Sequence, residues 1–187
     1  MALRVRPTAL PGVLLVEPEV HEDARGTFTE LFHARTYAQA GIPCTFVQDN
    51  CSRSRTGVVR GLHYQLDHPQ AKLICAVRGE VFDVAVDVRR GSPTFGQWTG
   101  ARLCGDARTQ LFVPAGFAHG FAVVRGPAEV LYKCTGFYAP DDDRGVLWSD
   151  PELGIDWPVD APIVSDKDAR LPPLARVPAQ DLPAYEP

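Results

Sequence analysis

The stretch EVFDVAVDVR, residues 80–89, alternates its side chains with the two-residue period of a β-strand. One face of this strand is apolar and carries Phe82, Val84, Val86 and Val88. The opposite face is mixed and carries Val81, Asp83, Ala85 and Asp87. A helix would scatter both sets around its surface. We therefore predict a strand that places two carboxylates among apolar neighbours.

Short apolar runs separated by turn signals continue on both sides of this strand. Further strands are predicted at residues 13–17, 27–32, 45–52, 58–64, 72–77, 109–113, 121–124 and 129–135. Helix is expected only at residues 34–40 and in one short stretch near the C-terminus. Nine or more short strands with so few helices are typical of a closed or double-sheet antiparallel architecture.

A proline-rich tail begins at about Pro172. Because proline cannot join a central ladder, we expect this tail to wrap the surface or to fray. The 187 residues fit one domain, and we treat residues 1–187 as a single unit with that tail at its end.

Composition excludes several classes of protein. A net charge of −4 argues against a general binder of nucleic acid or anionic membranes. No window approaches the ~20 apolar residues of a membrane span. The five cysteines are odd in number and form no CxxC pair, so neither a zinc knuckle nor a complete disulfide set is indicated. We expect a soluble, cytoplasmic protein with buried, reduced thiols at Cys44, Cys51, Cys75, Cys104 and Cys134.

The segment VPAGFAHGF, residues 113–121, resembles the second conserved motif of the cupin barrels. This motif favours a mainly β fold with a few short helices, a cupin-type double-stranded β-helix or jelly-roll barrel, and it directs His119 inward. A histidine that only packs in a turn explains the motif equally well. In metal-binding cupins a second histidine stands where GLHYQ has Gln65, and a carboxylate follows where this chain has Lys72. Because zinc or iron needs three or more such ligands, no metal is expected.

A barrel histidine that binds no metal is free to act as a general base, since its ordinary pKa of ~6.5 lies near working pH. His63 is this candidate, and a satisfied core histidine is the alternative. Either Asp83 or Asp168 is able to fix its tautomer. Lys72 lies in the apolar run AKLICAV, where a cation needs a partner or a chemical role, although its side chain can also extend to the barrel rim.

Several motifs in order, from about residue 10 to about residue 168, resemble the dTDP-4-dehydrorhamnose 3,5-epimerases. The motifs are DARGTFTE at 23–30, FVQDN at 46–50, VVRGLHYQ at 58–65, AKLICAVRGEVFDVAVDVRRGSPTFGQW at 71–98, QLFVPAGFAHGF at 110–121, LYKCTGFYAP at 131–140, LWSDPELGIDWP at 147–158 and SDKD at 165–168. The resemblance covers most of the chain.

The resemblance implies a role for each matched residue. His63 matches the proton-abstracting base, Asp168 its carboxylate partner and Tyr132 the proton donor. Lys72 matches a lysine beside the substrate carbonyl. Positions that contact the nucleotide or the sugar are matched by Arg25, Phe28, Glu30, Gln48, Asp49, Asn50, Arg60, His119, Tyr138, Asp143 and Lys167. Three residues depart from the family pattern, namely Asp143 in place of glutamate, and Cys51 and Thr27 in place of ring-bearing residues; the last two are expected to reshape the pocket walls.

The chemistry implied is epimerisation at C3 and C5 of a dTDP-4-keto-6-deoxyhexose through an enolate, giving dTDP-4-dehydro-L-rhamnose. No cofactor is expected, because the ketone already activates the neighbouring carbons. A single-centre epimerase of an antibiotic deoxysugar pathway would use the same His63 and Tyr132. A metal-dependent cupin enzyme and a non-catalytic sugar-nucleotide binding module are further alternatives. The resemblance also implies a homodimer in which strands near the N-terminus extend the partner's sheet.

Overall fold

The computed structural model describes residues 3–42 and 45–186, and two long antiparallel strands organise it. These are β7 (Lys72–Asp87) and β10 (Phe117–Cys134). Both strands change direction half-way. In β10 the register shifts between Val123 and Val130, and in β7 the bend lies at Gly79. Gly79 has φ +73°, and a Cβ there would lie 2.4 Å from the carbonyl oxygen of Arg125, so only glycine fits the bend.

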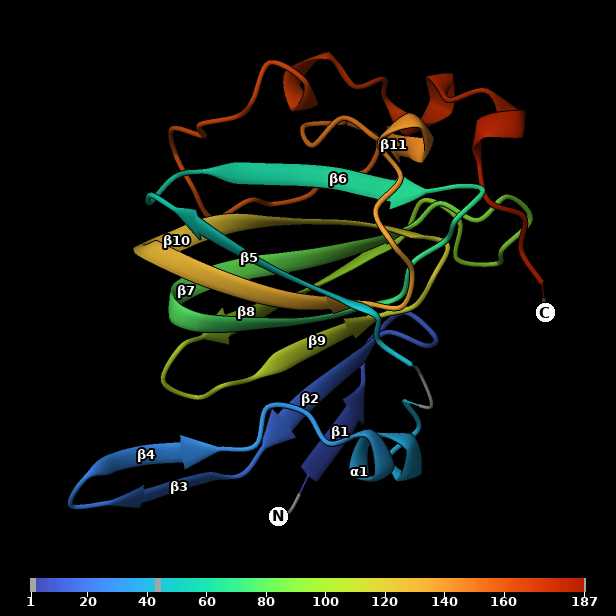
Figure 1. Cartoon of the computed structure of the whole chain (residues 1–187). Coiled ribbons are helices and arrows are strands. Elements are labelled where there is room, and N and C mark those ends of the chain that lie inside the picture. Colours follow the sequence, from blue (N-terminus) through green and yellow to red (C-terminus); the bar gives the residue numbers. More distant parts are fainter. Residues whose placement is uncertain (1–2, 43–44, 187) are drawn as a thin grey trace.

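The two bends fold a single sheet into two facing layers (Figure 1). In one layer the first half of β7 pairs with β9 (Gln110–Val113), and the second half of β10 pairs with β5 (Gln48–Ser54). This layer continues from β9 to β2 (Leu14–Pro18) and the edge strand β1 (Leu3–Pro7).

In the other layer the second half of β7 pairs with β8 (Trp98–Cys104). The first half of β10 pairs with β6 (Val59–Gln65), and the short β11 (Asp143–Gly145) follows β6. The predicted mainly β barrel with few short helices is confirmed. The strand β8 was not predicted from the sequence.

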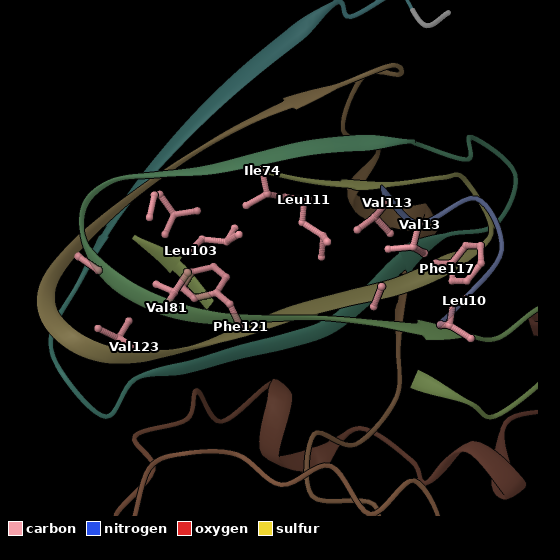
Figure 2. Packing of buried hydrophobic residues seen from close by; sticks show 14 residues of the cluster. Leu10, Val13, Ile74, Val81, Leu103, Leu111, Val113, Phe117, Phe121 and Val123 are labelled. Carbon is pink, nitrogen blue, oxygen red and sulfur yellow. The ribbon is translucent and has the colours of Figure 1, made fainter. Parts of the chain in front are cut away.

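Apolar side chains from both layers fill the barrel interior. Figure 2 shows β7 curving around this cluster, so that Ile74 and Val81 project into it from the two halves of the strand. The predicted faces of residues 80–89 are confirmed. Val81 and Ala85 belong to the interior cluster, while Val84, Val86 and Val88 belong to a second cluster on the outer side. Both faces of this strand are therefore buried, and Asp83 is buried with them.

The proline-rich tail wraps the barrel rather than fraying. It forms short 3-10 turns, η2 (Asp168–Arg170), η3 (Leu174–Arg176) and η4 (Ala179–Asp181), where one helical stretch was expected. Leu174 and Leu182 are buried against the outer face of the barrel. The hydroxyl of Tyr64 donates to the carbonyl oxygen of Asp181 at 2.8 Å. The guanidinium of Arg89 lies over the ring of Tyr185.

Two further elements lie outside the barrel. The hairpin of β3 (Val20–Asp23) and β4 (Gly26–Thr29) projects away from the body (Figure 1). The helix α1 (Ala34–Gln39) forms where helix was predicted, and a 3-10 turn, η1 (Pro140–Asp142), precedes β11. No helix in residues 3–42 and 45–186 has the length and apolar character of a membrane span.

Four of the five cysteines lie in the described ranges, and all four are free thiols; Cys44 lies outside the described residues. Cys75 and Cys134 are buried as predicted. The prediction was wrong for Cys51, which is exposed, and Cys104 is only half-buried. Cys51 lies on the face of β5 that points out of the barrel, because the inward positions of this strand are Gln48, Asn50 and Ser52.

Candidate active site

A cavity of about 550 Å³ opens at one end of the barrel interior. Strands from both layers line it, and the segment at residues 163–168 forms one side. Its lining residues include Ser52, Arg60, His63, Lys72, His119, Phe121, Tyr132, Tyr138, Asp143, Ile163, Ser165, Lys167 and Asp168. A second cavity of about 310 Å³ adjoins it and shares His63, Lys72 and Tyr132 with it, and adds Gln48, Asn50, Gln65 and Cys134. Together the two spaces can hold an elongated ligand.

His63 and Asp168 form a hydrogen-bonded pair in the cavity wall. The distance from His63 Nε2 to Asp168 Oδ1 is 2.7 Å, and the Asp168 side chain is only 6% exposed. The second carboxylate oxygen accepts a hydrogen bond from the backbone N–H of Gly61 at 3.2 Å. Burial raises the pKa of Asp168, but the hydrogen bonds from His63, Gly61 and Ser165 outweigh it and hold this pKa below its ordinary value. Asp168 is therefore ionised and fixes the imidazole.

Asp83 contacts a different histidine. Its two carboxylate oxygens both lie 3.0 Å from His119 Nε2, and the side chain has no solvent exposure. Of the two carboxylates considered for His63, the structure thus places Asp168 on His63 and Asp83 on His119.

Tyr132 projects from β10 into the cavity and packs against the interior cluster. Burial, more than the nearby Cys134, raises the pKa of its phenol, so the hydroxyl stays protonated at neutral pH. A protonated phenol in a cavity wall is able to deliver a proton to a bound carbanion or enolate.

Lys72 lines both cavities and so faces the interior rather than the rim. Burial lowers the pKa of its ammonium group, while Cys134, Asp143 and Asp83 act in the opposite direction. A partly desolvated cation of this kind stabilises negative charge on a ligand oxygen more strongly than an exposed one.

Polar residues converge at the mouth of the cavity. Asp143 Oδ2 accepts a hydrogen bond from the Tyr138 hydroxyl at 3.0 Å and is also paired with Lys167 Nζ. The bond to Asp143 raises the pKa of both Tyr138 and Lys167. Arg60 lines the same cavity, and its Nε donates to Ser54 Oγ at 3.1 Å. The cavity therefore presents a guanidinium and an ammonium group to an anionic ligand.

Four predicted contact residues do not line the cavity of their own chain. Arg25 and Phe28 lie on the projecting hairpin, where the Arg25 side chain is 90% exposed and pairs with Asp23. Glu30 follows this hairpin and is half-buried. Asp49 points out of the barrel and pairs with Lys133 Nζ at 2.8 Å. Gln48 and Asn50 do line the adjoining cavity.

The two pocket-wall departures lie elsewhere as well. Thr27 is on the hairpin and Cys51 is on the outer face of β5, so neither reshapes the cavity of its own chain. Asp143 is the departure that does reach the site.

Sequence reasoning missed several lining residues. Ser165 supports the turn that carries Asp168, because its Oγ accepts from the backbone N–H of Asp168 at 3.1 Å. The serine three residues before Asp168, in the pattern S-x-x-D at residues 165–168, was a signal for it. Ser52 and Ile163 line the cavity without any motif of their own, and Phe121 lines it at the end of the motif that carries His119.

Gln65 stands where a metal-binding cupin has its second histidine, and its amide has structural partners. Its Oε1 accepts from the backbone N–H of Ala139 at 2.8 Å, and its Nε2 donates to the carbonyl oxygen of His68 at 2.7 Å. Within the described ranges, no three histidine, cysteine, aspartate or glutamate side chains converge as metal ligands would.

The family model for dTDP-4-dehydrorhamnose 3,5-epimerase matches residues 7–176, which is most of the chain. The chain belongs to this epimerase family. It is therefore an enzyme of the isomerase class. The dTDP-4-dehydrorhamnose 3,5-epimerase of Pseudomonas aeruginosa is 57% identical over 162 residues, covering 86% of this chain and 90% of that protein.

Other epimerases match over most or all of their length. A crystal structure of dTDP-6-deoxy-D-glucose-3,5-epimerase from Legionella pneumophila, in complex with dTDP-4-keto-L-rhamnose, is 45% identical. It superimposes with a TM-score of 0.97 and covers 100% of both chains. A dTDP-4-dehydrorhamnose 3-epimerase from Streptomyces niveus is 44% identical over 188 residues, covering 98% of this chain and 90% of that protein. The family thus includes relatives named as epimerases of one carbon and relatives named as epimerases of two carbons.

Proposed function

We propose that this epimerase inverts C3 and C5 of dTDP-4-keto-6-deoxyglucose and releases dTDP-4-dehydro-L-rhamnose. One observation carries the proposal: the His63–Asp168 pair, Tyr132 and Lys72 all face the same cavity. A carbon acid next to a ketone needs a base, an acid and a cation near the oxygen, and these side chains supply all three.

His63 takes the proton from the carbon beside the ketone, and the electron pair moves to the keto oxygen as an enolate. Lys72 stabilises the charge on that oxygen. Tyr132 then returns a proton to the opposite face of the carbon, which inverts its configuration. The resulting phenolate regains a proton from water, and His63 releases the proton it took to solvent, so that both groups are ready for a second transfer. Proton transfer at the second carbon follows the same course. Each positioned acid or base contributes roughly 10²–10⁴-fold to the rate.

The nucleotide half of the substrate binds at the cavity mouth. Arg60 and Lys167 neutralise the diphosphate, and Tyr138, more than half exposed there, stacks on thymine. Base stacking of this kind contributes about 1–3 kcal/mol. These residues explain how a protein with a net charge of −4 binds a dianion. Free thiols at Cys75 and Cys134 fit a reducing, cytoplasmic setting.

The test is solvent exchange. The enzyme is incubated with dTDP-4-keto-6-deoxyglucose in D₂O, and the product is analysed by proton NMR. Deuterium at both C3 and C5 with inversion at both centres is the expected result. Label at one carbon only would assign a single-centre epimerase. Tight dTDP binding without any label would assign a binding module and would overturn the proposal.

We also propose a homodimer in which the β3–β4 hairpin of one copy reaches the cavity mouth of the other. Arg25 and Phe28 support this arrangement, because both are exposed on the hairpin and neither lines its own cavity. The unpaired edge of β1 offers a place for the partner's sheet to continue.

A complementation experiment tests this arrangement. Arg25→Ala and His63→Ala proteins are each expected to be impaired, and co-refolding them creates mixed dimers. If the hairpin acts on the partner, one site in each mixed dimer is fully wild type and activity returns. Activity that stays at the level of the separate variants would show that Arg25 serves its own chain. Light scattering supplies the oligomeric state.

A further inference from the structure

Two histidines lie side by side on the interior face of the barrel. His119 on β10 and His63 on β6 are direct register partners across the antiparallel pair. The Cβ atoms of such partners are roughly 4.5–5.5 Å apart, so the two imidazoles are neighbours. Each imidazole nevertheless contacts its own aspartate, Asp168 for His63 and Asp83 for His119.

Asp83 is an unusual residue to find in a barrel core. Its side chain has no solvent exposure and belongs to the same strand face as Val81 and Ala85 of the interior cluster. A buried carboxylate is costly unless it is paired and hydrogen-bonded. The hydrogen bonds to His119 supply that pairing. An apolar residue would fill the same space without the cost of burying a charge, so the carboxylate points to a role in the site.

The geometry fixes the protonation of one ring nitrogen. An ionised carboxylate can only accept hydrogen bonds, and both oxygens of Asp83 lie 3.0 Å from His119 Nε2. With Asp83 ionised, Nε2 carries a hydrogen and is committed to Asp83. Since His119 lines the cavity, Nδ1 is the ring nitrogen left for a ligand.

We propose that Asp83 is a positioning residue of this epimerase: it holds His119 with Nε2 protonated, keeps its imidazole away from the His63–Asp168 pair, and presents Nδ1 to an oxygen of the bound sugar nucleotide. The proposal rests on the proposed function for its ligand. With the hydrogen on Nε2, Nδ1 of the neutral imidazole accepts, so this oxygen is a hydroxyl that donates to it. The hydroxyl belongs either to the deoxyribose or to the hexose, and the two are separable by experiment.

The first test is spectroscopic and needs no substrate. In protein labelled with ¹⁵N-histidine, wild-type His119 is expected to show a protonated Nε2, with the resonance assigned by its loss in His119→Gln. In Asp83→Asn the amide is able to donate to Nε2, so the hydrogen moves to Nδ1. A wild-type spectrum with an unprotonated Nε2 on His119 would overturn the proposal.

The second test is a double-mutant cycle on the rate of deuterium exchange. Asp83→Asn is expected to lower kcat/KM by on the order of 10²-fold, the cost of a misplacement of about 1 Å at a group that positions the ligand. Because Asp83 acts through His119, the double variant with His119→Gln should be no slower than His119→Gln alone. Losses that multiply would show that Asp83 acts independently, and an unchanged rate in Asp83→Asn would remove its role.

Asp87→Asn is the matched control. Asp87 is equally buried on the same strand, but its partners are Arg89, Ser92 and Thr94, outside the cavity. This variant should lose stability without changing the His119 spectrum or the exchange rate of the folded enzyme. If Asp83→Asn weakens binding of dTDP alone, Nδ1 accepts from the deoxyribose hydroxyl; if it weakens only dTDP-glucose binding or the exchange rate, Nδ1 accepts from a hexose hydroxyl. Absence of exchange in the wild type would instead refute the proposed function, while the spectroscopic test would still stand.

Discussion

His63 and His119 are register partners on neighbouring strands, and the Nε2 atom of each contacts a different buried aspartate. The two imidazoles are thus held in fixed orientations before any ligand arrives. Such preorganisation matters because a misplacement of about 1 Å can cost 10²-fold in rate. The predictions below follow from these contacts and from the packing around them.

Asp168→Asn should lower the rate of deuterium exchange by on the order of 10³–10⁴-fold, because the amide no longer holds the base tautomer of His63. Binding of dTDP, measured by calorimetry, should be unchanged. Asp166→Asn, at an exposed position two residues away, is the control and should keep wild-type exchange. Exchange above a tenth of the wild-type rate in Asp168→Asn would contradict the assigned pair.

Tyr132→Phe should separate proton removal from inversion. His63 still removes the carbon-bound proton, so deuterium enters the substrate, but no acid remains on the opposite face to invert the carbon. Proton NMR in D₂O should therefore show labelled substrate of unchanged configuration. Tyr138→Phe removes a phenol at the cavity mouth and should leave inversion intact. Inverted product from Tyr132→Phe at the wild-type rate would assign the proton donor to another residue.

Acid should weaken the contribution of Asp168 to stability. Its folded-state pKa lies below the ordinary value of ~3.9, so the stabilisation is present above pH ~4 and is lost as the pH falls through the lower folded-state value. Urea unfolding of the wild type and Asp168→Asn should differ by about 1–3 kcal/mol at pH 6. The gap should narrow as the pH falls through the folded-state pKa, and a gap that does not narrow in acid would contradict the ionised pair.

Leu182→Ala should destabilise the fold although the residue lies only five positions before Pro187. Leu182 is buried against the outer face of the barrel, and removing such a side chain costs about 2–5 kcal/mol. The midpoint of urea unfolding measures the change. Val47→Ala, at an exposed position, should shift that midpoint by less than about 0.5 kcal/mol. Equal shifts in both variants would mean that the tail contributes little to the core.

Much of the fold was predictable because strand periodicity is local. Residues 80–89 showed which side chains share a face, and the structure keeps both faces. The continuity of β7 and β10 was not predictable, because Gly79 and the pair Gly126–Pro127 look like ends of strands. In the fold they mark a bend and an irregular register through which pairing continues.

The failure to predict strand β8 also has a physical cause. Gly100 interrupts its apolar pattern, yet a Cβ there would lie 2.4 Å from the ring of Phe82. Glycine is required by the neighbouring strand, which a local pattern cannot reveal.

Several residues that line the cavity could be named from the sequence, and the family resemblance also named Asp168 as the partner of His63. From the residues alone Asp83 and Asp168 were equivalent partners for His63, since the register that pairs His119 with Ala85 and brings it to Asp83 comes from tertiary pairing. The position of Asp49 was available from alternation, because its neighbours Gln48 and Asn50 both point inward and a strand residue between them must point out.

The bend at Gly79 divides β7 into two halves, and each half carries a different charged residue of the site. Lys72 stands before it and Asp83 beyond it, just as Tyr132 and His119 stand on either side of the matching irregularity in β10. Lys72, Tyr132 and His119 are consequently all carried by the same two bent strands, β7 and β10. A substitution at Gly79, which lies outside the cavity, would change the angle between the two halves of β7 and so shift several cavity side chains at once. This glycine is therefore a target for changing the geometry of the site without removing any ligand contact.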